Sequence, residues 1–272
     1  MQEIVNSLKN QGSKIGFVPT MGALHQGHLT LLQQSLKDND FSVVSIFVNP
    51  TQFNNPEDLI KYPRTIDTDL EKLKDAGCDY VFLPSVEEMY PNEPISETWN
   101  FGNLEAVMEG KNRPGHFQGV ATVVRLLFDA VPANNAYFGM KDYQQLLIIK
   151  EMVRQLALEI QIVPVPIVRE ADGLAMSSRN MRLTAEERQL APFIYQTLKQ
   201  AVALAKQLSV EELKQVVKEQ INHKPPMVLE YFEMADGNDL QPVKTLENHQ
   251  SVRAFIVVDL NGVRLIDNIS II

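Results

Sequence analysis

The first two thirds of the chain alternate between short apolar segments rich in β-branched residues and segments with helical spacing of apolar residues. The apolar segments lie at residues 15–19, 41–48, 80–83, 136–138 and 160–165. Runs of this length suit strands buried on both faces of a parallel sheet. The helical candidates lie at residues 29–37, 68–76, 120–130 and 146–156. This β–α alternation predicts an α/β fold with a doubly wound, Rossmann-like parallel sheet.

The last hundred residues have a different pattern. Thr184 with Glu187, and Ser209 with Glu212, have the spacing of capping boxes and each predicts the start of a helix. An extended segment is expected at 228–234. The Asn-Gly pair at 261–262 separates two segments rich in valine and isoleucine, which indicates a two-residue hairpin. We therefore expect a smaller C-terminal α+β domain of helices and antiparallel strands.

A polar loop after the prolines at 164 and 166 places the domain boundary within residues 166–183. The expected domains are residues 1–170 and 171–272. Two domains also agree with the length, because 272 residues exceed the ~150 residues of an average domain.

Composition narrows the range of partners. Acidic residues number 34 and basic residues 25, which gives a net charge of −9 and disfavours a nucleic-acid-binding function. Cys78 is the only cysteine, so the chain has no intrachain disulfide and no Cys-based zinc site. Apolar runs fall short of the ~20 residues that a membrane span needs, and residues 1–14 lack a signal-peptide pattern. These features predict a cytoplasmic location.

The strongest candidate site is the segment PTMGALHQGH at residues 19–28, between the first predicted strand and the first predicted helix. In doubly wound folds this turn is a favoured phosphate site, because the helix N-terminus offers unpaired N–H groups. Gly22 and Gly27 allow close approach of a ligand, and His25 and His28 can donate to phosphate oxygens. The spacing alone leaves two alternatives open: histidines that only cap the helix, or a metal site.

A second motif, read together with the histidine segment, favours a nucleotide-binding role for both. The His-x-Gly-His segment resembles the HIGH signature of the nucleotidyltransferase superfamily, which includes the class I aminoacyl-tRNA synthetases. Those proteins also carry a mobile Lys-Met-Ser-Lys-Ser-type loop after the parallel sheet. Met176-Ser177-Ser178-Arg179-Asn180 stands in that place. Its hydroxyls and guanidinium are suited to a polyphosphate.

Six blocks between residues 15 and 185 together resemble the pantoate–β-alanine ligases, the pantothenate synthetases. In chain order they are PTMGALHQGH, NPTQF, YPRT, RPGHFQGV, FGMKDYQQ and MSSRN. The resemblance implies a two-step reaction in which the pantoate carboxylate attacks the α-phosphorus of ATP and releases pyrophosphate. The amine of β-alanine then attacks the pantoyl adenylate, which gives pantothenate and AMP. It also implies Mg²⁺ with ATP, a homodimer and a C-terminal domain that covers the site.

The resemblance also implies site residues at matching positions. Those carried over to ATP are Met21, Gly22, Ala23, Leu24, His25, Gln26, Gly27, His28, Gly139, Met140, Lys141, Asp142, Val168, Met176, Ser177, Ser178 and Arg179. Gln52 and Gln145 would hold pantoate, and Gln52 would also meet β-alanine. The expected catalytic residues are His28, as proton donor or charge stabiliser, with His25, Lys141 and Arg179.

The side chains give these roles a physical basis. Neutral amides can orient a nucleophilic carboxylate, whereas a bidentate arginine would draw off its charge. Asp142 can either cap the following helix or contact the nucleotide, and His116 can either bind substrate or shape the turn into its helix. Neither Asp67 nor Asp69 is expected to bind the metal, whose ligands stay open.

The chain departs from the family pattern at two positions. Met140 stands where many relatives have glutamate, so a contact there would use the backbone, and Ala175 replaces the leading lysine of the synthetase loop. Two other classes remain as alternatives: another adenylate-forming nucleotidyltransferase of the HIGH superfamily, and a non-catalytic nucleotide-binding module.

Overall fold

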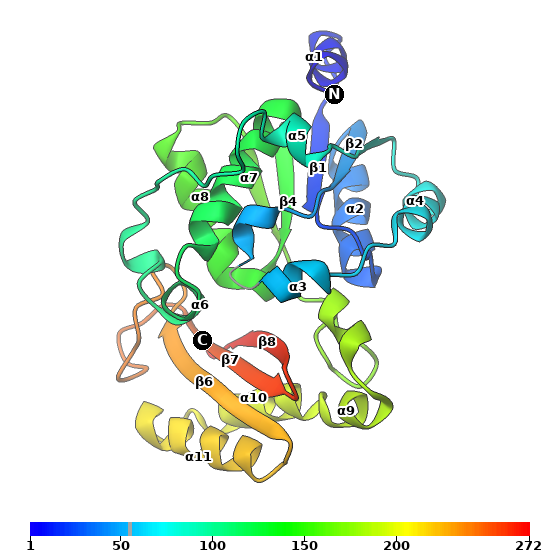
Figure 1. Ribbon diagram of the computed structural model, residues 1–272. Coiled ribbons are helices and arrows are strands. Elements are labelled where there is room, and N and C mark those ends of the chain that lie inside the picture. The colour runs from blue at the N-terminus through cyan, green and yellow to red at the C-terminus, as the bar shows by residue number, and fades with distance from the viewer. Residues whose placement is uncertain (54–55) are drawn as a thin grey trace.

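The computed structural model describes residues 1–53 and 56–272. A parallel sheet of five strands forms the larger part, in the order β3-β2-β1-β4-β5 (Figure 1). Its strands are β1 (Ile15–Thr20), β2 (Phe41–Ile46), β3 (Tyr80–Phe82), β4 (Asn135–Gly139) and β5 (Gln161–Val165). All five lie within about two residues of the predicted segments, and the predicted α/β fold with a doubly wound sheet is confirmed.

Helices cover both faces of this sheet. Figure 1 shows α2 (Gln26–Asp38) and α4 (Ile66–Asp75) on one side and α7 (His116–Ala130) and α8 (Tyr143–Gln155) on the other. Successive side chains of a strand point to opposite faces. In β4, Ala136 and Phe138 accordingly pack in the core under α7 and α8, whereas Tyr137 joins the core under α2.

Shorter elements complete this part. They are α1 (Gln2–Asn10), α3 (Pro56–Ile60), α5 (Val86–Met89), α6 (Met108–Asn112), and the 3₁₀ turns η1 (Pro50–Gln52), η2 (Gly102–Leu104) and η3 (Met140–Asp142). The apolar spacing in the sequence did not predict α1, α3, α5 or α6. In α5, Ser85 and Glu88 form a capping box.

The C-terminal part is a three-stranded antiparallel sheet packed against helices. After the turn η4 (Ser178–Arg182) come α9 (Ala185–Leu190), α10 (Phe193–Leu204), α11 (Val210–Asn222), β6 (Met227–Asp236), β7 (Val252–Leu260) and β8 (Val263–Ser270). Both predicted capping boxes are present. Asn261 and Gly262 adopt positive φ angles of 51° and 82° between β7 and β8, as a hairpin turn of this type requires.

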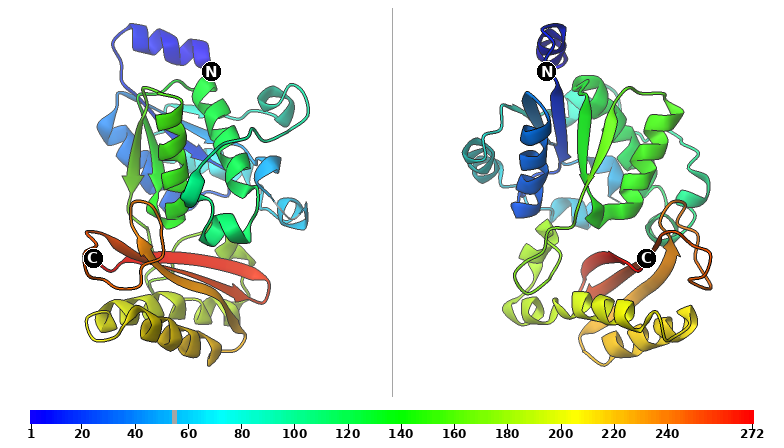
Figure 2. Two further views of the ribbon diagram at one scale, coloured as in Figure 1. Left: turned by 90° about the vertical axis from the view of Figure 1, so that its left-hand side faces the viewer. Right: turned by 180° about the vertical axis from the view of Figure 1, so that it is seen from behind.

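The antiparallel sheet lies below the carboxyl ends of the parallel strands, with α10 and α11 on its far side (Figures 1 and 2). A small apolar cluster joins the two parts: Met108 from α6 packs with Ala235, Leu240 and Phe255. Polar contacts add to it, because Asn268 of β8 donates to the carbonyls of Met140 and Lys141. Within the described residues, no helix is long and apolar enough to cross a membrane.

Candidate active site

A cavity of about 240 Å³ lies at the carboxyl ends of β1 and β4. The strand order reverses between these two strands, and ligands of doubly wound folds bind at this point. The cavity brings together fourteen of the residues expected from the sequence. They are Met21, His25, Gly27, His28, Gln52, Gly139, Lys141, Asp142, Gln145, Val168, Met176, Ser177, Ser178 and Arg179.

Five of the expected ATP-binding residues do not line this cavity. Gln26 is exposed on α2, and the carbonyl of Met140 accepts a hydrogen bond from Asn268. Gly22, Ala23 and Leu24 are buried behind the cavity wall. The last three therefore shape the turn that carries the histidines rather than facing the cavity.

His25 and His28 form a pair of tilted rings at the start of α2, with ring centroids 4.0 Å apart and an interplanar angle of 33°. Nδ1 of His25 accepts the Gly27 N–H at 3.1 Å, and Nδ1 of His28 accepts the His25 N–H at 3.3 Å. His25 is thus also the N-cap of α2, which was one of the alternatives left open by the sequence.

Both imidazoles are neutral. Burial and then the nearby Lys141 lower the pKa of His25 to about 4, and burial and then His25 lower the pKa of His28 well below 6.5. Because each Nδ1 accepts a hydrogen bond, the single proton of each neutral ring lies on Nε2. The pair can therefore offer two Nε2–H donors without carrying a charge.

Asp69 holds the turn that precedes the histidines. Its fully buried carboxylate accepts the N–H groups of Ala23 and Leu24, each at 2.8 Å. Gly22 and Ala23 have positive φ angles of 79° and 49°, and such a conformation is unfavourable for alanine. Lys72, one turn further along α4, donates to the Leu24 carbonyl at 2.6 Å. Two groups of α4 thus stabilise a strained turn.

Gln52 lies in η1 with only 9% of its surface exposed. Asn49 donates to its side-chain oxygen at 3.3 Å and to the Gly119 carbonyl at 3.2 Å, which ties η1 to α7. A Cβ at position 119 would lie 2.4 Å from the Thr51 carbonyl oxygen, so only glycine allows this approach. Gln145, near the start of α8, supplies the second amide of the cavity.

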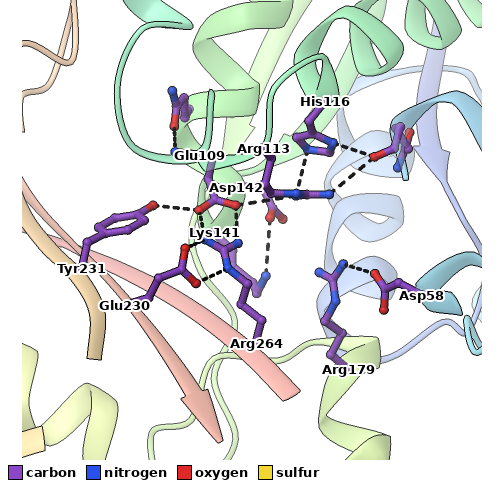
Figure 3. Close-up of polar contacts among 12 residues, drawn as sticks. Asp58, Glu109, Arg113, His116, Lys141, Asp142, Arg179, Glu230, Tyr231 and Arg264 are labelled. Atoms are coloured by element: carbon purple, nitrogen blue, oxygen red, sulfur yellow. Dashed lines mark hydrogen bonds and ion pairs between the residues drawn. The ribbon is translucent and has the colours of Figure 1, made fainter. Parts of the chain in front are cut away.

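Two of the expected catalytic residues are cations that line the cavity from different elements. Lys141 lies 3.5 Å from Asp142, whose side chain makes no capping bond although it occupies the N-cap position of α8 (Figure 3). Arg179 of η4 pairs with Asp58 at 3.2 Å. The same turn contacts the histidine segment, because Ser178 donates to the Ala23 carbonyl at 3.2 Å.

Several cavity residues were not assigned from the sequence. Arg113 and His116 lie in the wall, and His116 both begins α7 and bonds the Gln52 carbonyl at 2.9 Å. Both roles left open for the RPGHF block are therefore compatible with the geometry. Tyr62 lines the cavity from the YPRT block, and Asp69 acts from behind it. Asp69 and Lys72 lie three positions apart on α4, and this spacing has no sequence pattern that predicts their support of the histidine turn.

The described residues contain no group of three or more histidine, cysteine or acidic side chains arranged to hold a metal ion. The alternative of a metal bound by the histidine pair therefore has no third ligand in this part of the chain. Among the residues that the structure describes, Asp142 is the acidic one that lines the cavity, and its side chain is 47% exposed.

Comparisons with known proteins agree with this geometry. The sequence profile of the family described as pantoate–beta-alanine ligase matches residues 1–270. A pantothenate synthetase of Bacteroides thetaiotaomicron is 52% identical over 269 residues, which cover 99% of this chain and 95% of that protein.

Solved structures give the same result. Pantothenate synthetase from Thermus thermophilus superposes with a TM-score of 0.90 at 44% identity, covering 95% of this chain and 93% of that one. The Francisella tularensis pantoate–β-alanine ligase, complexed with β,γ-ATP and β-alanine, has a TM-score of 0.81 at 37% identity and covers 99% and 94%. This chain belongs to the pantoate–β-alanine ligase family.

Proposed function

We propose that this protein condenses pantoate with β-alanine and converts ATP to AMP and pyrophosphate, with pantothenate as the organic product. A carboxylate oxygen of pantoate attacks the α-phosphorus of ATP, and the bond to the β-phosphate breaks as pyrophosphate leaves. The β-alanine amine then attacks the acyl carbon of the adenylate and displaces AMP. The names of the relatives, and the ligands of the Francisella tularensis enzyme, support this reaction and these substrates.

The neutral histidine pair is the observation that carries the mechanism. Negative charge builds on the phosphate oxygens as the pentavalent transition state forms, and fixed N–H donors stabilise it. His25 and His28 offer two such donors from one helix N-terminus, whose own dipole favours anions. Their low pKa values favour hydrogen-bond donation by neutral rings over proton transfer.

The amides and cations have complementary tasks. Gln52 and Gln145 would orient pantoate through its hydroxyls and carboxylate without neutralising the nucleophile. Lys141 and Arg179 would bind the leaving pyrophosphate, and Arg179 would exchange its Asp58 partner for phosphate. The Met176–Arg179 segment, Val168 and Gly139 would complete the nucleotide site.

We also propose that Mg²⁺ enters with ATP. Magnesium usually keeps water and substrate phosphates as most of its ligands, so a dedicated protein cage is not required. Asp142 lines the cavity, and its carboxylate would contact the water shell of the ion. When bound, the ion would screen the phosphate charge against the incoming carboxylate.

Three further expectations remain proposals. Residues 171–272 would act as a domain that covers a site built by residues 1–170. A cytoplasmic location is supported by the cysteine content, because Cys78 is the only cysteine in the sequence and the chain therefore needs no oxidising compartment. Burial raises the pKa of the Cys78 thiol to about 11, which suits an unreactive side chain. A homodimer rests on the family resemblance.

An omission assay tests the function and separates it from another adenylyltransferase. With ATP, pantoate and β-alanine, AMP and pantothenate should form in equal amounts, and omitting either organic substrate should stop AMP release. Replacing pantoate with other small carboxylic acids should give no product. A faster reaction with a different acid, or ADP in place of AMP, would contradict the proposal.

A further inference from the structure

A second, smaller cavity of about 50 Å³ adjoins the first, between α6, α8 and the antiparallel sheet. The two cavities share Arg113, His116 and other wall residues. The remaining wall carries charged and polar groups from both parts of the molecule: Glu109 from α6, Tyr231 from β6 and Arg264 from β8 (Figure 3).

Glu109 is the centre of this group. It is 8% exposed, and its carboxylate accepts two hydrogen bonds from Arg264, at 2.5 and 2.6 Å, and one from the Tyr231 hydroxyl at 2.8 Å. Burial alone would raise the pKa of Glu109, but the bonds from Arg264 and Tyr231 lower it to about 2. Arg264 also holds Glu230, at 2.5 and 2.8 Å. A buried carboxylate of α6 is thus neutralised by the antiparallel sheet.

The contacts continue from Glu109 toward the active site. Arg113 lies 3.6 Å from the Glu109 carboxylate and 3.1 Å from Nε2 of His116. Burial and Arg113 lower the pKa of His116 to about 4, so its ring is neutral. Nε2 accepts from the guanidinium, which leaves the proton on Nδ1, and Nδ1 donates to the Gln52 carbonyl at 2.9 Å. The direction of the hydrogen bond from Arg113 to His116 therefore determines the direction of the bond from His116 to Gln52.

We call this chain of contacts the relay: Arg264, Tyr231, Glu109, Arg113, His116 and the Gln52 carbonyl. Docking of the antiparallel sheet does not depend on it alone. The apolar cluster around Met108 and Phe255, the Arg169–Asp267 ion pair and the bonds from Asn268 join the same two parts. The relay differs from those contacts because it ends on the main chain of a substrate-binding residue.

We propose that Arg264 is a positioning residue, which acts through Glu109, Arg113 and His116 to hold Gln52 in place for the carboxylate substrate. The identity of that substrate as pantoate rests on the proposed function. Docking of the C-terminal sheet would then set the affinity for pantoate, although no residue of that sheet needs to touch it.

The test compares Arg264→Lys with Glu230→Gln in the full-length protein. Lysine keeps the charge but cannot bond both carboxylates in the bidentate manner of arginine. Amide hydrogen exchange at residues 51–53, measured without substrates, should rise about fivefold in Arg264→Lys because local opening becomes easier. The pantoate KM should rise roughly tenfold, as for one weakened charged hydrogen bond, with the ATP KM within about twofold. Glu230→Gln leaves the Arg264–Glu109 pair intact and should resemble the wild type.

Tyr231→Phe is the milder second variant, and it should change both readings in the same direction by a smaller factor. Unchanged exchange at 51–53 in both variants would overturn the proposal, and so would equal rises in the pantoate and ATP KM values. The exchange measurement does not depend on the reaction. A wild-type protein that made no pantothenate would therefore refute the proposed function, while the exchange comparison would still decide on the relay.

Discussion

Two polar walls of the active-site region differ in how their groups are charged. We call them the histidine wall, formed by His25 and His28, and the ionised wall, formed by Glu109 and Arg264. At the end of β1, His25 and His28 are partly buried as neutral rings, whose pKa values lie below the usual range. On the side of the antiparallel sheet, Glu109 is buried as a full charge and is paired with Arg264. A buried group must either lose its charge or be matched by a partner.

This difference follows the expected tasks of the walls. Neutral donors do not hold the ground-state triphosphate as tightly as cations would, and their contribution grows as charge develops in the transition state. The ionised wall fixes geometry, because bidentate guanidinium–carboxylate pairs are strongly directional. We therefore expect changes in the histidine wall to lower kcat, and changes in the ionised wall to raise KM for pantoate.

Replacing a residue of the histidine wall should have the largest effect on activity. His28→Ala removes one transition-state donor, so kcat should fall by roughly 10²- to 10³-fold, with less change in either KM. Steady-state kinetics with a thermal-unfolding control would measure this. A loss of kcat below about threefold would exclude His28 from the mechanism.

Gln52→Ala tests the point where the two walls meet. Loss of a hydrogen bond to a charged substrate should lower kcat/KM for pantoate by roughly tenfold to a hundredfold. Gln26→Ala, which alters an exposed amide of the same type on α2, is the matched control. If the two variants have equal kinetics, Gln52 does not hold pantoate.

Asp69→Asn tests how the histidine wall is supported. An amide cannot accept from both Ala23 and Leu24 without turning its NH₂ group toward a donor, so the strained turn should shift. We expect kcat/KM for ATP to fall about tenfold, as for one lost hydrogen bond to a carboxylate. Asp67→Asn changes an exposed carboxylate of the same helix and should have no effect. A decrease that only follows the folded fraction would mean that Asp69 serves stability alone.

The pH dependence of stability should give the smallest effect. His116 stays neutral in the folded protein down to about pH 4, whereas an unfolded histidine takes up a proton below about pH 6.5. The unfolded state then binds more protons, so stability falls as the pH drops from 6.5 toward 4. The wild-type protein should lose about 1 kcal/mol more than His116→Gln between pH 7 and 5.5. Urea unfolding at both pH values measures this, and parallel losses would show that His116 is protonated in the folded state.

The sequence predicts the histidine wall better than the ionised wall for a physical reason. The histidine turn, the strands and the hairpin at Asn261–Gly262 depend on local spacing and backbone preference, which neighbouring residues encode. Glu109 and Arg264 are 155 residues apart, and their pairing depends on how the two parts dock.

The helix starts show the same limit on a smaller scale. Capping boxes identify α9 and α11 in the sequence, whereas α1 has no side-chain cap and was not predicted. The bonds of Asp69 to a turn 45 residues earlier likewise have no pattern in the sequence, because they depend on how α4 packs beside β1.

Isotope exchange between ATP and pyrophosphate, with pantoate present and β-alanine absent, tests the central claim most directly. If neutral imidazoles at the end of β1 assist attack on the α-phosphorus, labelled pyrophosphate should enter ATP only when pantoate is added. This exchange should be roughly 10²- to 10³-fold slower in His28→Ala and unchanged in Glu230→Gln. Absence of pantoate-dependent exchange in the wild-type protein would contradict the adenylate mechanism.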